Sequence, residues 1–265
     1  MKILIVTFGI IISIGLFSKM RIEPKIEFDP SIKLNNLKPK PVGLFLSMSG
    51  VIGKTKEDVE KCLNEYAKDN NGDFVKEDLD NDNENFCVLN EKNGNVTVFY
   101  PSGFNESGDM SKYISEKLNC PVFFFHIHDG DLWLYFLYNK GNLVDQFNPI
   151  PDYWDDSLSE TEIDEQKGNP QIVTRLVPNV KEQDIVNYYV RWDLDAEPFK
   201  AYPQDEFTNK DWQVVDFMNK IGLEYPISDR GTALGTVYKF WIPEPSEKNK
   251  EKESSTSKKW WEFWN

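Results

Sequence analysis

The stretch Pro121–Trp154, PVFFFHIHDGDLWLYFLYNKGNLVDQFNPIPDYW, is the densest aromatic segment of the chain and holds both of its histidines, His126 and His128. Three apolar runs within it favour β-strands: residues 121–128, 131–138 and 142–147. Asp129-Gly130 and Lys140-Gly141 separate these runs, and such pairs favour two-residue turns between antiparallel strands. The stretch therefore predicts a three-stranded meander.

The turns also predict which side chains share a face of this meander. With two-residue turns, His128 lies opposite Asp131, and His126 lies opposite Trp133. Successive side chains of a strand point to opposite faces. One face then collects the residues of the predicted binding surface: His126, His128, Asp131, Trp133, Tyr135, Gln146 and Asn148. The other face is apolar and contains Asp145, a charge that such a core tolerates only near an edge.

Upstream residues predict two helices and three further strands. A strand over 42–48 ends at Ser49-Gly50, and a helix begins at Thr55 with Asp58 in a capping box. An acidic, Asn-rich loop over 69–85 follows. Strands over 86–89 and 96–100 flank Asn93-Gly94, a strong hairpin signal. Asp109 caps the second helix.

The resulting order is β-α-β-β-α-β-β-β, which is the split βαβ order of ferredoxin-like folds extended by the meander. We therefore expect an α+β protein with an antiparallel-rich sheet and two helices on one face, a different strand order being the alternative. The C-terminal half is predicted to be mostly helical, with helices over 157–166, 171–176, 183–192 and 207–221 and a late strand over 236–242.

The two ends of the chain differ in kind from the body, which is expected over residues 41–243, with a sheet half over 41–148 and a helical half over 149–243. Residues 1–18 form a hydrophobic segment in which residues 3–18 are uncharged and mostly apolar, with basic residues on either side of that run, which predicts a membrane anchor with the body in the cytoplasm. The alternatives are a cleaved signal peptide with a secreted or periplasmic body, and translation from Met20, which leaves a cytoplasmic protein. Residues 19–40 form a tether.

Residues 244–265 are a charged linker with an aromatic end. Its predicted contact residues are Trp260, Trp261, Phe263 and Trp264. Three roles stay open: contact with a membrane surface, docking in a groove of a partner, and folding back onto the body.

The net charge of −14 limits the partners. Such a chain is repelled by phosphate backbones, so we expect a basic protein partner and no nucleic acid. Cys62, Cys87 and Cys120 have no metal-binding spacing and are expected to be buried thiols. No glycine-rich phosphate loop is present, and no cofactor is expected.

The histidines are the one place where chemistry is conceivable. His126 and His128 could ligate a metal, and His128 with Asp131 could form an oriented catalytic pair. Neither a nucleophile elbow nor a papain-like cysteine accompanies them. A turn at Asp129-Gly130 and a cross-strand polar pair explain the same residues, so no catalytic or metal residue is predicted.

The segment HDGDLWLYFLYNKGNLVDQFNPIPDYW resembles a recurrent segment of uncharacterised bacterial proteins, with its HDGD turn, Y-x-LY strand, G-x-LVD turn and P-DYW ending. DWQVVDFMNKIGL is similar to the W-Q-x-x-D helix of the same proteins. The resemblance spans roughly residues 95–223 and implies no activity or catalytic residue. Its general pattern is similar to that of immunity proteins, which neutralise toxins.

These observations predict a non-enzymatic, membrane-associated binding protein, immunity-like in role, which acts through an acidic and aromatic surface. The alternative is a hydrolase or metal-dependent enzyme that uses His126, His128 and Asp131.

Overall fold

A computed structural model describes residues 45–78, 83–128, 132–153, 155–192, 213–228 and 230–243. The chain divides into residues 1–40 and 41–265, and every described residue belongs to the second unit. The described part is an α+β body with one antiparallel sheet, which confirms the predicted class. Within these ranges no helix combines the length and the apolar character that crossing a membrane requires.

Within the described residues the sheet has eight strands: β1 Leu46–Val51, β2 Asp73–Lys76, β3 Phe86–Lys92, β4 Asn95–Phe99, β5 Pro121–His128, β6 Leu132–Asn139, β7 Asn142–Phe147 and β8 Thr236–Trp241. Their order across the sheet is β2-β8-β3-β4-β1-β5-β6-β7. The described helices are α1 Lys56–Asp69, α2 Ser107–Leu118, α3 Glu160–Asp164, α4 Pro170–Leu176, α5 Glu182–Ile185 and α6 Gln213–Lys220.

Local signals place several of these elements where they were expected. Thr55 and Asp58 form the predicted capping box of α1. Asn93-Gly94 and Lys140-Gly141 have positive φ at both residues, the backbone that a two-residue hairpin turn requires. The predicted role of Asp109 as a helix cap is wrong, because α2 begins earlier and Asp109 lies in its first turn.

The first strand extends further than predicted. Ser49 and Gly50 were expected to end it, yet both lie within β1. The Ser49 hydroxyl is hydrogen-bonded to Tyr100 (2.5 Å) and Ser111 (2.6 Å), so its polar group is satisfied in the core. Gly50 leaves room for Leu223, which comes from the C-terminal half and packs against this point of the strand.

Strand β2 lies within the segment that was predicted to be an acidic loop. Its four residues pair with β8, from Asp73 opposite Trp241 to Lys76 opposite Tyr238. β8 also pairs with β3, so a strand from the end of the body separates β2 from β3. A short polar segment has little strand preference of its own, and its conformation depends on this distant partner.

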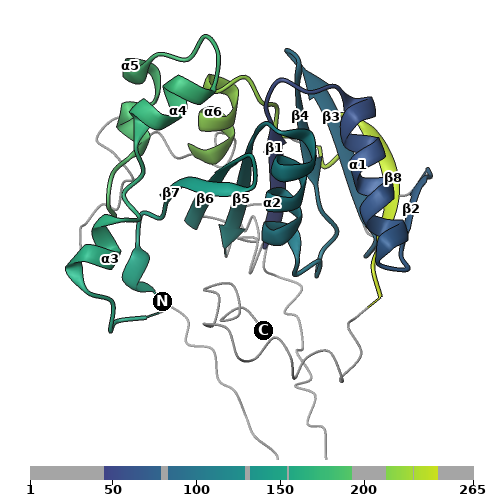
Figure 1. Cartoon of the computed structure of the whole chain (residues 1–265), viewed down its shortest axis with the longest axis horizontal. Helices are drawn as coiled ribbons and strands as arrows, with labels where there is room; N and C mark the ends of the chain where they lie inside the picture. Colours follow the sequence, from purple (N-terminus) through teal and green to yellow (C-terminus); the bar gives the residue numbers. More distant parts are fainter. Residues whose placement is uncertain are drawn as a thin grey trace, which may run out of the picture. The chain divides into compact units, whose positions relative to one another are not determined.

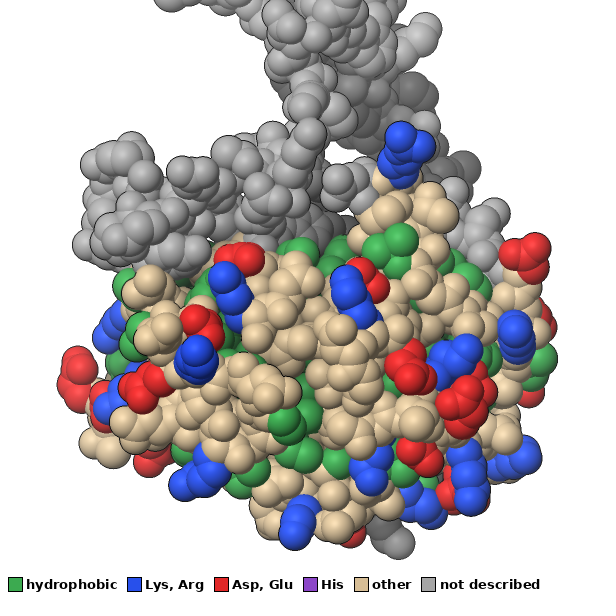
Figure 2. All heavy atoms as spheres, turned by 90° about the horizontal axis from the view of Figure 1, so that it is seen from above, with side chains coloured by type: hydrophobic (Ala, Val, Ile, Leu, Met, Phe, Trp, Pro, Cys, Tyr) green, Lys and Arg blue, Asp and Glu red, His purple; other side chains and the backbone are tan. Residues whose placement is uncertain are grey.

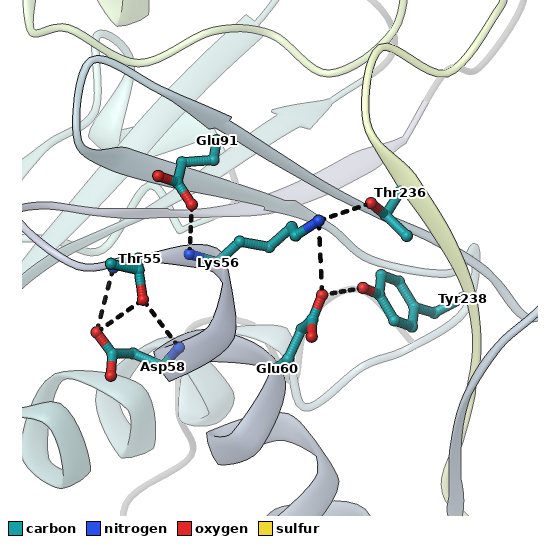
Figure 3. Close-up of polar contacts among 7 residues, drawn as sticks. All are labelled: Thr55, Lys56, Asp58, Glu60, Glu91, Thr236 and Tyr238. Carbon is teal, nitrogen blue, oxygen red and sulfur yellow. Dashed lines mark hydrogen bonds and ion pairs between the residues drawn. The ribbon is translucent and has the colours of Figure 1, made fainter.

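Polar contacts with α1 hold β8 in place (Figure 3). The Lys56 ammonium donates to the Thr236 hydroxyl at 3.0 Å and lies 3.8 Å from the Glu60 carboxylate. The Tyr238 hydroxyl donates to the same carboxylate. At the helix N-terminus the Lys56 backbone N–H donates to Glu91 at 2.6 Å, which places a carboxylate at the positive end of the helix dipole.

The two faces of the sheet carry different layers. Helices α1 and α2 lie along one face, while α4, α5 and α6 gather at the β5–β7 end (Figure 1). The α1–α2 side has its own apolar cluster, which includes Val59, Met110 and Ile114. The other face packs against the C-terminal half in a larger cluster. Both faces of the central strands are therefore buried.

The C-terminal half docks through α6. Val214, Phe217, Met218 and Ile221 are all buried, as the predicted stripe requires, and Gly222 has a positive φ after the helix. The Phe217 ring lies 5.3 Å from the Trp133 ring and 5.7 Å from the Tyr135 ring, measured between centroids. The predicted helices over 157–166 and 183–192 are shorter in the structure, and residues 207–212 lie outside the described ranges.

The close packing at Gly50 yields a stability prediction. A methyl group on Gly50 would lie 2.3 Å from Leu223 Cδ1 and 3.2 Å from Phe125 Cε2. Gly50→Ala should therefore lower the free energy of unfolding by about 1–3 kcal/mol. In the background of Leu223→Ala the same substitution should cost much less, so a denaturant-unfolding double-mutant cycle should give a coupling above about 1 kcal/mol.

The matched control is Gly108→Ala in α2, where the nearest atom to the added methyl is 3.9 Å away. It should not destabilise the protein, because alanine is the better helix former. Additive effects of the two substitutions at Gly50 and Leu223 would contradict the proposed packing.

Candidate functional site

The connection between β5 and β6 decides which residues can form a site together. His128 pairs with Leu132, His126 with Leu134 and Phe125 with Tyr135. Three residues, 129–131, therefore join the strands, and the predicted pairing of His126 with Trp133 is wrong by one position. Because side chains alternate along a strand, a one-residue change of register moves a whole set of side chains to the other face.

The predicted surface is accordingly split between the two faces. Trp133 and Tyr135 are fully buried with Phe217 on the face that packs against the C-terminal half. His126 and His128 point to the α1–α2 side. Asp131 lies outside the described residues, so the predicted pair of His128 and Asp131 stays a prediction.

The β6–β7 turn follows the predicted register only near its tip. Tyr138 pairs with Leu143 as expected, but a β-bulge then shifts the pairing, so that Tyr135 lies opposite Phe147 and not opposite Gln146. Gln146 instead faces Phe136. Asn148 is buried, and its backbone N–H donates to the Gln166 carbonyl at 2.9 Å. Asn148 therefore lies in the connection between β7 and α3.

His126 pairs across the sheet with Ser47 of β1. The Ser47 hydroxyl lies 3.0 Å from His126 Nδ1. Burial, and next the neighbouring His128, lower the pKa of His126 from 6.5 to about 3. The imidazole is therefore neutral at physiological pH and resists taking up a proton.

His128 lies at the end of β5 between two exposed aromatic rings. Its ring centroid is 4.6 Å from that of Phe45 and 6.0 Å from that of Tyr153, both in edge-on geometry. Phe45 is 47% exposed and Tyr153 49%, among the most exposed large apolar side chains described. We call these three residues the His128 surface.

Sequence reasoning missed the two aromatic members of this surface. Phe45 was assigned to a buried strand, and Tyr153 appeared only in the P-DYW ending of the resembling segment, with no role predicted for either. Their only sequence signal is proximity to strand ends. The contact between Phe45 and His128 joins segments that are far apart in the chain, so periodicity within either segment could not reveal it.

The W-Q helix has a structural explanation. The indole N–H of Trp133 donates to Gln213 Oε1 at 2.8 Å, and both side chains are buried. A buried indole N–H needs an acceptor, and the first residue of α6 supplies it. Trp133 of the meander segment and Gln213 of the helix segment therefore contact each other in the core, and these two positions of the resembling segments serve packing.

Asp145 was expected to be an unfavourable charge on the apolar face. It lies on that face, and hydrogen-bond donors surround it. It accepts hydrogen bonds from the Tyr135 hydroxyl at 2.6 Å and the Asn169 backbone N–H at 3.2 Å, and the Tyr189 hydroxyl is 3.0 Å from that of Tyr135. Burial raises its pKa from 3.8 to about 6, although the Tyr135 hydrogen bond opposes the shift. This cluster ties β7 to the C-terminal half.

The chemistry available at the histidines is limited. Across the described ranges, no group of three or more histidine, cysteine or acidic side chains could hold a metal ion. Ser47 and His126 have the distance of a nucleophile–base pair, but the lowered pKa of His126 disfavours the imidazolium that such catalysis forms.

Comparisons of the chain with protein-family models, with curated proteins and with solved structures found no match.

The lowered pKa of His126 predicts acid instability. Below pH 6.5 the unfolded chain binds a proton at this residue, while the folded protein resists protonation down to about pH 3. His126 should therefore reduce the free energy of unfolding by up to about 1.4 kcal/mol per pH unit in that window. His126→Gln, which cannot titrate, should show a shallower loss in urea unfolding between pH 7 and 4. Equal slopes for both proteins would refute the buried, neutral imidazole.

Asp145 should act in the opposite direction. Its folded pKa of about 6 lies above its ordinary 3.8, so the folded state binds a proton more readily. Stability from this group is present at low pH and is lost as pH rises through 6. Relative to Asp145→Asn, the wild-type protein should therefore lose about 1–3 kcal/mol between pH 4 and 7.5. A difference in unfolding free energy that does not change with pH would contradict this assignment.

Proposed function

We propose that this chain is a non-enzymatic binding protein that holds a protein partner at the His128 surface. The observation that carries the proposal is the exposure of Phe45 and Tyr153 on either side of His128. Large aromatic side chains at the centre of a contact surface contribute most of the energy of many protein interfaces. Of the predicted surface the proposal keeps His128, and it adds Phe45 and Tyr153, which were not among the predicted binding residues.

Charge supports a basic partner. The chain has a net charge of −14, and long-range attraction of this kind mainly accelerates association and selects oppositely charged surfaces. The negative charge is not gathered into a single patch on every face of the body. Figure 2 shows acidic and basic side chains interspersed over the face seen there. We therefore assign specificity to the aromatic contact and attraction to the overall charge.

The proposal keeps the expected setting of the protein. Residues 3–18 would anchor it at a membrane, and its role would be immunity-like, the neutralisation of a basic toxin. Residues 3–18 lie outside the described residues, and the proposed immunity-like role rests on the sequence resemblance.

We also propose that the first half is a ferredoxin-like unit and the second a mostly helical layer. In support, β1 lies between β4 and β5, α1 follows β1, and α2 precedes β5, as in a split βαβ arrangement.

A hydrolase is the second candidate, and the Ser47–His126 distance of 3.0 Å is the observation that favours it. A fluorophosphonate probe separates the two functions. Labelling of the wild-type protein that is lost in Ser47→Ala would support the hydrolase, whereas we expect no labelling of either protein.

The binding proposal predicts that position 153 contacts the partner. A photo-crosslinking amino acid placed at Tyr153 should capture the partner in cells, and the captured protein can then be identified and purified. Tyr153→Ala should weaken its binding by about 2 kcal/mol, roughly thirtyfold, in calorimetric titration. His128→Ala should weaken it in the same direction.

The matched control is Leu143 on β7, which is 48% exposed but lies away from the histidines. Leu143→Ala should leave the affinity within about twofold, because isolated surface contacts contribute little. Equal losses for Leu143→Ala and Tyr153→Ala, or an unchanged affinity in Tyr153→Ala, would place the interface elsewhere.

A further inference from the structure

Strand β2 forms one border of the sheet, at the opposite end from β7 (Figure 1). Of the strands that the structure describes, only β8 pairs with it. The Glu77 backbone N–H continues this ladder and donates to the Val237 carbonyl at 3.3 Å. Because hydrogen-bonded positions alternate along an antiparallel pair, the odd-numbered residues of β2 direct their backbone groups to β8. Phe74 and Lys76 therefore direct their N–H and C=O groups to the outer edge.

Two large apolar side chains are exposed beside this edge. Val75 is 47% exposed and Trp241 is 43% exposed. Val75 pairs with Lys239, two residues before Trp241, so the two apolar side chains are diagonal neighbours on one face of the sheet. Phe74 points to the opposite face, where its ring lies 4.5 Å from that of Tyr238. The outer edge therefore has an apolar side on which a further strand can pack.

The edge also has two features that limit chance pairing. It is only four residues long and includes Lys76, and both features disfavour association with arbitrary strands. The exposed side chains of Val75 and Trp241 act in the other direction, because an apolar edge favours pairing. Together these features fit an edge that accepts a strand of selected chemistry.

The charge of the surrounding segment selects that chemistry. Between residues 69 and 84 the sequence has one basic residue, Lys76, and seven acidic ones: Asp69, Asp73, Glu77, Asp78, Asp80, Asp82 and Glu84. The Asp73 carboxylate lies 3.1 Å from the Lys239 ammonium, so this charge is partly compensated. The segment as a whole attracts a strand with basic side chains and repels an acidic one.

We propose that the outer edge of β2 is a docking site for an extended, basic segment of a protein partner, which adds to the sheet as a further strand. Main-chain hydrogen bonds to Phe74 and Lys76 would hold this segment, and its apolar side chains would pack on Val75 and Trp241. The site is separate from the His128 surface, because β8, β3, β4 and β1 lie between β2 and β5. This inference goes beyond the proposed function and does not depend on it.

A second copy of this chain fits the edge less well. Two antiparallel β2 strands use the outer backbone groups of both residues when Phe74 of one copy lies opposite Lys76 of the other. That register places Asp73 opposite Glu77, and like charges directly opposite each other are destabilising. Two chains with a net charge of −14 also repel each other.

The linker after β8 is also a poor occupant. Residues 244–259 contain no aromatic residue and only one β-branched residue, Thr256. They therefore lack the residue types that favour a strand. A segment from a partner has no such restriction on its composition.

A fluorescently labelled peptide of alternating lysine and valine, KVKVKVK with blocked ends, tests the site on the full-length chain. We expect binding in an anisotropy titration, and the affinity should fall as salt screens the attraction. The acidic peptide EVEVEVE should not bind. Two further peptides carry methyl groups on the backbone nitrogens of all lysines or of all valines. Only one alternate set of a strand faces β2, so one methylated peptide should lose roughly tenfold or more in affinity while the other keeps it.

A pair of substitutions at Lys76 tests the same contact from the side of the protein. Lys76→Pro removes an N–H that faces away from β8, which an edge strand tolerates, and should weaken peptide binding by about fivefold or more. The matched control, Lys76→Thr, keeps the N–H and removes a like charge, so the peptide should bind at least as tightly as it binds the wild-type chain. Leu143→Ala on β7 should leave the affinity unchanged. If Lys76→Pro unfolds the protein, the two methylated peptides still decide the question with the wild-type chain.

Several outcomes would overturn the proposal. Absence of binding, or equal effects of the two methylated peptides, would exclude main-chain pairing at the edge. Loss of binding in Tyr153→Ala would place the peptide at the His128 surface. Wild-type dimers in analytical ultracentrifugation that dissociate in Lys76→Pro would make a second copy the occupant. Tighter peptide binding after replacement of the aromatic residues of segment 260–264 by Ala would make the chain's own end the occupant.

Discussion

The pairing of β5 with β6 is the constraint on which the other contacts of the body depend. A strand presents alternate side chains to opposite faces. The observed register therefore places Phe125, Trp133 and Tyr135 together on one face. That face receives Phe217 of α6 and the hydrogen bond from Trp133 to Gln213. The opposite face keeps the histidines together with a buried cluster of Phe124, Leu134, Phe136 and Tyr138. A one-residue change of register would exchange the two sets of side chains between the two buried faces.

The two ends of the sheet are completed by different means. At the β7 end, Asp145 and its tyrosine partners join the strand to the C-terminal half. At the other end, β8 inserts between β2 and β3, and Glu60 and Lys56 of α1 bond to it. A strand from the end of the described body is therefore inserted at this end of the sheet, and among the described strands β2 pairs with β8 alone.

The histidines show how burial sets chemical character. His126 is close enough to a hydroxyl group to act as its base, yet its burial disfavours the imidazolium that such a proton transfer would form. His128, two residues along, lies between exposed rings. His126 and Asp145 also respond to acid in opposite directions over overlapping pH ranges, so their effects on stability partly cancel. If one of the two residues is replaced, the pH dependence of stability that the other contributes is no longer partly cancelled.

The sequence by itself determined the α+β class, the capping box at Thr55, the turns at Asn93-Gly94 and Lys140-Gly141, and the buried stripe of α6. Each of these depends on residues close together in the chain, where propensity and periodicity act directly. Only the tertiary structure decided the register across residues 129–131, the strand character of β2, and the contacts of His128 with Phe45 and Tyr153. These depend on a loop one residue longer than the turn signal implied, and on partners far away in sequence. Burial against such partners outweighs the weak local preferences of the segments involved.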